Sequence, residues 1–450
     1  MSIYNKTSKN ILLPMADIVS GTSIYSNLKF LEKSQWWSLK DLNVYQNKKL
    51  RALIRYAYRN VPYYHKEWKK IKLNPDDIRT TADLTKIPII TKEDVKSNFN
   101  AFKSGNMSDN KFNPSSTGGS TGEPLSFLCD WNAWSIGWAC LYRGWGFGGY
   151  NVGDKIVTIG GSSLVPSKRP SFKKRIKDRV IERHLGVSAF DMSEDNMGEY
   201  CKIINKYKPL YLRGYATSLY IFAKFCRDND ISFSTLRGIF STAENLFPQY
   251  RKEIEDSLGV EVFNEYGVRD GGGHAAECRM HSGQHISLER SVMEFVRDKE
   301  NVSSNEMGSI ILTDLHNYSF PFIRYEVGDM GTSTGECCSC GRGLPLVKRI
   351  DGRITEIIRF SDGTMWSGPV LTLVFAKFDI KQYQVVQNDE DKILLKIVKG
   401  NTFSNIDEYN LIQIFNYHVG KHGSIEIEYV DEIPVTKSGK RKFIISKITN

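Results

Sequence analysis

The chain has 450 residues, of which 40% are hydrophobic and 12% are aromatic. This composition excludes wholesale disorder, and the length predicts two or three domains. The net charge of +10 favours anionic partners in a general way. No apolar run reaches the roughly 18 residues of a membrane-spanning helix, and the run at residues 11–15 is too short for a secretory signal. We therefore expect a cytoplasmic protein.

Helices and strands alternate through the middle of the chain. Such alternation predicts a parallel sheet covered on both faces by helices. In chain order, the predicted elements are a basic helical segment at 47–70, strands at 155–160, 210–214, 236–241 and 260–264, and helices at 217–228 and 247–258.

A basic segment at residues 168–183 carries much of the positive charge. Phe172, Ile176 and Val180 recur at every fourth position, which predicts an amphipathic helix with a basic outer face. Most such faces are simply solvated. The alternatives are contact with an anionic substrate, with a phosphorylated lipid carrier or with the inner face of a membrane. Nucleic acid is a weaker alternative, because no helix-turn-helix or RRM signature accompanies the charge.

From about residue 305 the pattern changes to short strands between Gly, Asp and Asn turns. We predict an α/β fold with a large N-terminal domain of parallel or mixed sheets and helices over residues 1–352, and a small α+β domain over residues 353–450. The predicted strands are 309–313, 323–325, 354–360, 382–387, 393–398, 425–430 and 443–446, with a helix at 405–419.

The loop at residues 115–124 is the most distinctive segment. Its three glycines and five hydroxyl residues disfavour both a helix and a strand. Glycine lets backbone N–H groups approach phosphate oxygens closely, although a solvated linker is the alternative. The segment lacks the Gly-Lys-Ser/Thr ending of a Walker-type loop. The predicted phosphate-binding residues are Ser115, Ser116, Thr117, Gly118, Gly119, Ser120, Thr121 and Gly122.

Six motifs follow one another in order: this loop and the segments 241–244, 264–270, 320–329, 349–353 and 434–440. The series resembles the adenylate-forming superfamily, specifically its phenylacetate–CoA ligase branch, and most of all the CapK-type members of capsular polysaccharide biosynthesis. The resemblance covers nearly the whole chain from about residue 45. It implies that the small C-terminal domain is a mobile lid.

The resemblance also implies roles for individual residues. Lys440, carried by the lid, would neutralise the α-phosphate and the carboxylate together during adenylation. Tyr266 would offer an aromatic face to adenine. Asp329 would accept both ribose hydroxyls, and Arg353 would contact ribose or the α-phosphate. Further nucleotide contacts are expected from Ala243, Glu244 and Gly267.

Three positions depart from the family pattern. Asp270 stands where relatives usually carry a Mg²⁺-binding glutamate, so the metal would sit closer or be bound through water. Thr355 replaces an acidic residue at the expected hinge, residues 353–356. Glu123 stands where relatives commonly have lysine or a neutral residue. These departures keep open a noncatalytic nucleotide-binding role.

Four of the eight cysteines gather in two short stretches that also carry histidines. In a reducing compartment such a cluster indicates metal more than disulfide. Three thiolates and one imidazole suit tetrahedral Zn²⁺, and similar structural zinc sites occur in this branch of the family. Free cysteines without metal are the alternative. The predicted ligands are Cys278, His285, Cys338 and Cys340, with Cys337 or His281 as a substitute for one of them.

We predict an ATP-dependent ligase that activates a small carboxylic acid as acyl-AMP and transfers it to CoA, an amine or an amino sugar in capsule or O-antigen assembly. An adenylyltransferase that stops at an AMP adduct, and a noncatalytic protein of a polysaccharide complex, are the alternatives. ATP, Mg²⁺, structural Zn²⁺ and, for a thioester product, CoA are the expected cofactors, and a homodimer is left open. Candidate acyl-site residues, which core packing explains equally well, are Trp134, Trp138, Gly214 and Tyr215.

Overall fold

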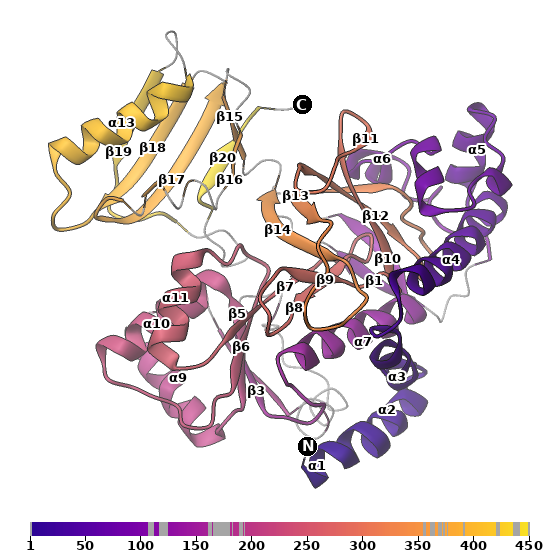
Figure 1. The fold of residues 1–450 in the computed structure, drawn as a ribbon, viewed down its shortest axis with the longest axis horizontal. Helices are drawn as coiled ribbons and strands as arrows, with labels where there is room; N and C mark the ends of the chain where they lie inside the picture. The colour runs from indigo at the N-terminus through magenta and orange to yellow at the C-terminus, as the bar shows by residue number, and fades with distance from the viewer. Residues whose placement is uncertain are drawn as a thin grey trace.

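The computed structural model shows a large N-terminal part and a smaller C-terminal part, each built around its own sheet (Figure 1). Most of the predicted phosphate loop, nearly all of the basic segment at 168–183, and Lys440 lie outside the residues that the structure describes. For Arg353 only the backbone is described. The described residues are 2–106, 112–116, 125–160, 164, 181, 183–188, 192, 194–353, 357–360, 365–367, 371, 374–375, 377–389, 392–419, 424–434 and 442–448.

The chain begins with helices that the sequence analysis did not predict. Leu13, Leu28 and Leu31 are fully or almost fully buried in a core shared with α7 (Trp131–Phe147). Further along, Pro62 starts a new helix directly after Val61, because proline is favoured in the first turn of a helix and blocks continuation of the preceding one. The helices of this region are α1 (Ile3–Thr7), α2 (Leu13–Ser20), α3 (Ile24–Ser34), α4 (Leu39–Asn60), α5 (Pro62–Lys70) and α6 (Lys92–Ser97).

A mixed sheet of 12 strands forms the centre of the N-terminal part, in the order β11-β10-β12-β13-β14-β9-β8-β7-β6-β5-β3-β4. The last five strands of this order, from β7 to β4, are parallel, as predicted. The remaining pairings are antiparallel. The parallel strands are β3 (Ile156–Gly160), β4 (His184–Ser188), β5 (Tyr211–Tyr215), β6 (Gly238–Thr242) and β7 (Val262–Gly267).

The antiparallel strands continue the same sheet beyond residue 305, where we expected a change to short strands between turns. The strand predicted at 323–325 starts too early, because β13 begins only at Tyr325. The antiparallel strands are β8 (His274–Glu277), β9 (Gln284–Ile286), β10 (Ser291–Arg297), β11 (Glu300–Asn301), β12 (Met307–Asp314), β13 (Tyr325–Thr334) and β14 (Leu346–Arg353), while β1 (Phe112–Ser116) and β2 (Ser126–Asp130) form a separate hairpin.

Helices cover both faces of the parallel part of the sheet (Figure 1). One face packs on α9 (Glu194–Tyr207), α10 (Ala216–Asp228) and α11 (Pro248–Leu258), through a core that includes Ile159, Leu212 and Ile239. The other face packs on α7 through Tyr211 and Phe240. Successive residues of a strand point to opposite faces, so Arg213 lies on the α7 side and Gly214 on the α10 side.

The C-terminal part has its own core. A four-stranded sheet in the order β19-β18-β17-β20 packs on α13 (Asn405–Val419), with Leu395, Leu411 and Phe415 fully buried. The strands are β17 (Ile380–Asp389), β18 (Lys392–Lys399), β19 (Ser424–Tyr429) and β20 (Ile444–Ser446), and a small ribbon of β15 (Ile357–Arg359) and β16 (Met365–Ser367) adjoins them.

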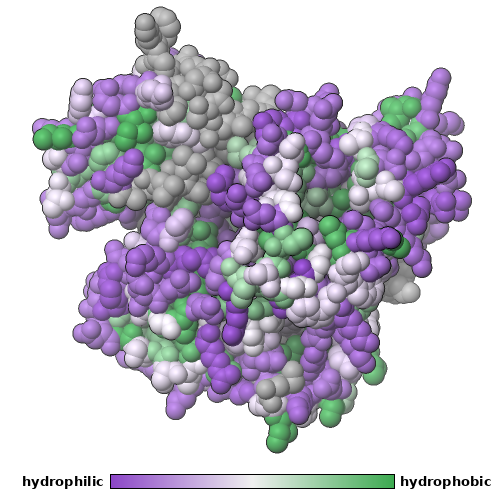
Figure 2. All heavy atoms as spheres, in the orientation of Figure 1, coloured by the Kyte–Doolittle hydropathy of each residue, from purple (hydrophilic) through white to green (hydrophobic). Residues whose placement is uncertain are grey.

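The face of the molecule seen in Figure 2 is largely hydrophilic where it is coloured, with scattered apolar side chains. In the described part of the chain, no helix combines the length and the hydrophobicity needed to cross a bilayer.

Candidate nucleotide and acyl site

The carboxyl ends of the parallel strands gather residues from several predicted motifs. In open α/β sheets, ligands bind outside these strand ends. β5 ends at Tyr215, β6 at Thr242 and β7 at Gly267, and the three strands are direct neighbours in the sheet. The topology therefore places the segments 241–244 and 264–270 at one edge.

Tyr266 and Asp329 come together, as expected of two residues that contact one nucleotide. The Tyr266 hydroxyl donates a hydrogen bond of 2.8 Å to Asp329 Oδ2, across 63 residues of sequence. Both side chains are only 9% exposed. Arg353 joins them through the backbone, because it is the register partner of Asp329 between β13 and β14. Three predicted nucleotide residues from three separate motifs thus lie at one place.

Asp270 lies on the turn after β7 and is buried. Its Oδ2 accepts a hydrogen bond of 3.1 Å from the Tyr325 hydroxyl. Tyr325 starts β13, the strand that also carries Asp329. A buried carboxylate on this turn suits a hard cation such as Mg²⁺, which favours oxygen ligands. The assignment of Asp270 to magnesium stays a prediction.

Two further nucleotide candidates occupy the turn after β6. Ala243 has a φ of +64°, a left-handed conformation that is unfavourable for a residue with a Cβ and is often found at functional turns. Glu244 accepts a hydrogen bond of 2.9 Å from the Thr217 backbone amide in the first turn of α10. At the start of the predicted phosphate loop, Ser115 and Ser116 form the end of β1 and pair with β2.

The candidate acyl residues divide into two groups. Trp134 and Trp138 lie on successive turns of α7 with their ring centroids 6.0 Å apart, and both are partly exposed. Tyr215 is fully buried. Gly214 is required by packing, because a Cβ there would lie 2.6 Å from the backbone oxygen of Ile159. The two tryptophans therefore remain accessible, whereas Gly214 and Tyr215 belong to the core.

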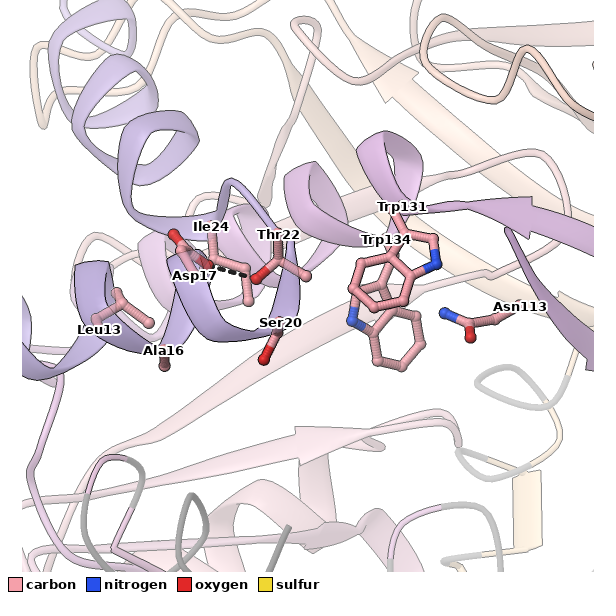
Figure 3. Close-up of a pocket in the computed structure, with 9 residues that line it drawn as sticks. All are labelled: Leu13, Ala16, Asp17, Ser20, Thr22, Ile24, Asn113, Trp131 and Trp134. Carbon is pink, nitrogen blue, oxygen red and sulfur yellow. Dashed lines mark hydrogen bonds between the residues drawn. The ribbon is translucent and has the colours of Figure 1, made fainter. Parts of the chain in front are cut away.

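A pocket of about 180 Å³ lies between α2, α3 and the start of α7 (Figure 3). It includes Trp134 and the neighbouring Trp131, together with Asn113 of the strand that leads into the phosphate loop. The full lining is Leu13, Ala16, Asp17, Ser20, Thr22, Ile24, Asn113, Trp131 and Trp134.

The sequence analysis missed a polar group beneath α7. Arg213 of β5 forms an ion pair of 2.8 Å with Glu265 of β7. Glu265 also accepts hydrogen bonds from the Trp145 indole at 2.7 Å and from the Thr242 hydroxyl at 3.2 Å. The signal in the sequence was a single arginine within the apolar strand at 210–214, where charges are rare unless paired.

Cys278, His285, Cys338 and Cys340 form one cluster, in agreement with the predicted set. Their ligand atoms all lie within 4.8 Å of one another. His285 Nε2 lies 3.4 Å from the sulfurs of both Cys278 and Cys340, and the sulfurs of Cys278 and Cys338 are 3.6 Å apart. The cysteines flank the ends of β8 and β14, and His285 belongs to β9. Three sulfurs and one nitrogen converging in this way fit a closed structural Zn²⁺ site.

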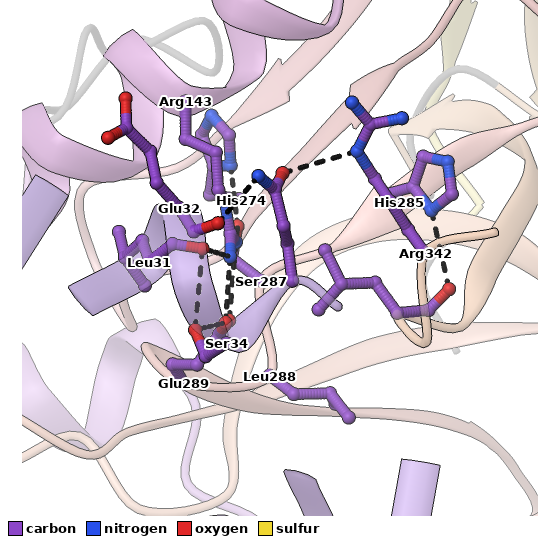
Figure 4. Close-up of polar contacts among 12 residues, drawn as sticks. Leu31, Glu32, Ser34, Arg143, His274, His285, Ser287, Leu288, Glu289 and Arg342 are labelled. Carbon is purple, nitrogen blue, oxygen red and sulfur yellow. Dashed lines mark hydrogen bonds and ion pairs between the residues drawn. The ribbon is translucent and has the colours of Figure 1, made fainter. Parts of the chain in front are cut away.

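The surroundings of His285 suit a metal ligand. Burial lowers the pKa of His285 to about 4, which keeps the imidazole neutral. Its Nδ1 lies 3.3 Å from the Leu344 carbonyl (Figure 4), the kind of contact that orients the ring of a metal-bound histidine. Neither proposed substitute belongs to the cluster: Cys337 is exposed, and His281 Nδ1 lies 3.3 Å from Glu277.

Comparison with known proteins agrees with the predicted family. Residues 361–447 match the family described as the CapK C-terminal domain. The chain is 28% identical to Protein CapK of Staphylococcus aureus over 99% of both chains. It is 26% identical to the phenylacetate–coenzyme A ligase of Escherichia coli, covering 71% of this chain and 73% of that protein.

Among solved structures, a 2-hydroxyisobutyryl-CoA ligase in complex with 2-HIB-AMP resembles this fold with a TM-score of 0.69 at 18% identity, covering 89% of both chains. The fold, the ordered motifs and these relatives lead to one conclusion. The chain has the fold of the adenylate-forming ligases and is similar in sequence to CapK and to the phenylacetate–CoA ligases.

Proposed function

We propose that this protein is an ATP-dependent acid ligase that activates a small carboxylic acid as its acyl-AMP. The observation that carries the proposal is the contact between Tyr266 and Asp329, beside the backbone of Arg353. These residues were selected from separate motifs for separate contacts to one nucleotide. The similarity to phenylacetate–CoA ligases over more than two thirds of the chain supports the same reaction class.

In this reaction a carboxylate oxygen attacks the α-phosphorus of ATP and pyrophosphate leaves. Asp329 would hold the ribose hydroxyls, and Tyr266 orients Asp329 through its hydroxyl. Magnesium, held by Asp270, would neutralise phosphate charge when bound. Lys440 would bring a second positive charge to the α-phosphate from the small domain, which we place at residues 353–450. The nucleotide is thereby fixed by the large domain, and the lid supplies the charge that develops only during reaction.

The second half-reaction would transfer the acyl group from AMP to an acceptor. The acceptor would be CoA, an amine or an amino sugar, and the similarity to CapK over the full chain supports a role in capsule or O-antigen assembly. We place the protein in the cytoplasm, with the basic segment at 168–183 as the candidate contact to an anionic lipid carrier or to the inner face of the membrane.

An ATP–pyrophosphate exchange screen over aryl, amino, hydroxy and uronic acids tests the proposal. At least one acid should stimulate exchange, and Lys440→Ala should slow that exchange by about 100-fold or more, as expected for loss of a charge that acts in the transition state. Lys442→Ala, close by in sequence and outside the motif, is the matched control. Exchange in Lys440→Ala at the wild-type rate would contradict the mechanism. ATP binding without exchange for every acid would favour the noncatalytic alternative.

A further inference from the structure

The face of α7 that covers the sheet carries a row of aromatic rings leading to one arginine. Trp134 and Trp138 lie 6.0 Å apart, and Trp138 and Tyr142 lie 5.8 Å apart. Tyr142 and Trp145 are again 5.8 Å apart, and the Arg213 guanidinium lies 5.2 Å from the centre of the Trp145 ring. The row is thus continuous from the accessible tryptophans to the group beneath α7.

Arg213 has unused hydrogen-bonding capacity. A guanidinium carries five N–H donors, yet among the described residues only Glu265 accepts a hydrogen bond from it, and Nε has no partner. The side chain is 14% exposed, so part of it is open to solvent. Donors that are neither satisfied by protein nor fully solvated are rare in folded proteins, and they favour a ligand that carries acceptors.

The charge of this group restricts what the ligand carries. Glu265 already neutralises Arg213 at 2.8 Å. Burial lowers the pKa of the nearby His274 to about 3, so that imidazole is uncharged. Among the described residues of this group, a second carboxylate on the acid would find no uncompensated positive charge. An alkyl or aryl acid would cover the spare donors without pairing them. A hydroxyl group supplies an acceptor without adding charge.

We propose that the acid substrate carries one or more hydroxyl groups, and that Arg213 is the specificity residue that binds them while Trp134 and Trp138, the accessible end of the aromatic row, pack against its carbon skeleton. This inference rests on the proposed function, because it assigns the acid of the same adenylation reaction. It narrows the screen to hydroxy and polyhydroxy acids.

The test compares acids in matched pairs by ATP–pyrophosphate exchange: lactate with propionate, gluconate with hexanoate, and hydroxyphenylacetate with phenylacetate. Succinate and β-alanine serve as charged competitors. Wild-type protein should favour the hydroxy member of at least one pair by about tenfold or more in kcat/KM, since a site built to bind a hydroxyl discriminates against the analogue that lacks it.

Arg213→Met should abolish this preference by lowering the rate with the hydroxy acid alone. The variant should lose stability, because the buried Glu265 carboxylate keeps only the hydrogen bonds from Trp145 and Thr242. Arg213→Lys keeps the positive charge without the guanidinium donors, so it is the second variant and should lose the preference while staying folded. Arg227→Met, in which the replaced arginine is an exposed residue of α10, is the matched control and should retain the preference. Circular dichroism and a thermal melt verify folding of all three variants.

The outcomes separate the two proposals. Exchange that is equal for both members of every pair, or greatest with succinate or β-alanine, overturns the hydroxy-acid inference and leaves the ligase standing. A preference that survives in Arg213→Met overturns the role of Arg213. Absence of exchange with every acid overturns the proposed function and this inference together.

Discussion

Replacing Glu289 with glutamine tests how α7 is held in place. Arg143 of α7 forms a two-pronged ion pair with Glu289, with Nη1–Oε1 and Nη2–Oε2 distances of 2.7 and 3.2 Å (Figure 4). The two side chains are 2% and 0% exposed. Ser34 at the end of α3 donates a further hydrogen bond of 2.5 Å to the same carboxylate. The pair therefore links α3, α7 and the segment between β9 and β10.

The variant Glu289→Gln leaves the Arg143 cation buried without its counter-charge. Breaking a buried pair from one side costs about 3–5 kcal/mol, a large share of the roughly 5–15 kcal/mol that stabilises a typical folded protein. Urea denaturation should show this loss as a lower transition midpoint. Because α7 carries Trp134 and Trp138, the KM for the acid should rise as well.

A matched pair of variants separates burial from charge. Glu253→Gln removes the partner of Arg227 at the surface and should leave the midpoint unchanged, since exposed ion pairs contribute little. The double variant Arg143→Met with Glu289→Leu should lose less stability than Glu289→Gln, because it removes both charges. A midpoint for Glu289→Gln equal to that of Glu253→Gln would refute the reasoning.

Three further predictions follow from the site. Cys340→Ser should lower the zinc content measured by elemental analysis from about one ion per chain to a small fraction, because a tetrahedral site loses one of four ligands; unchanged content would exclude the proposed set. Tyr266→Phe should raise the KM for ATP by about fivefold, as expected from about 1 kcal/mol for the lost hydrogen bond to Asp329; an unchanged KM would exclude the proposed role of the hydroxyl in orienting Asp329. The hydrogen bond to Glu277 raises the pKa of His281 above 6.5 in the folded protein. The protonated ring therefore stabilises the fold fully at pH values below the pKa of His281 in the unfolded protein, and this stabilisation is lost as the pH rises through the pKa in the folded protein. The difference in denaturation midpoint between wild type and His281→Gln should therefore shrink as pH rises from 6.5, and a constant difference would contradict this.

Helices of both the parallel part and the C-terminal part were predictable because their signals are local. The helices expected at 217–228, 247–258 and 405–419 agree with α10, α11 and α13 within a residue or so. Each has a compact apolar pattern of its own. The helices α1–α3 were not predicted, because their burial depends on α7, more than 100 residues away in sequence. Local pattern alone does not reveal such a partner.

The site shows the same division between local and distant signals. Tyr266 and Asp329 were found through motifs, and the structure joins them. Arg213 and Glu265 were not paired in advance, because they are 52 residues apart and their contact depends on β5, β6 and β7 being neighbours in one sheet. In the cysteine cluster, the sequence left Cys337 or His281 as a substitute for one of the four predicted ligands. Burial separates Cys337 from these four, since Cys338 points into the cluster and Cys337 is exposed.

The hairpin of β13 and β14 links the metal cluster to the nucleotide site. At one end its strands pair Asp329 with Arg353, and at the other they are joined by the turn that carries Cys338 and Cys340. β14 also pairs with β9, which places Leu346 opposite His285. A metal ion at this turn would fix the register of the hairpin, and with it the position of the carboxylate proposed to hold ribose. Loss of zinc should therefore weaken ATP binding as well as stability.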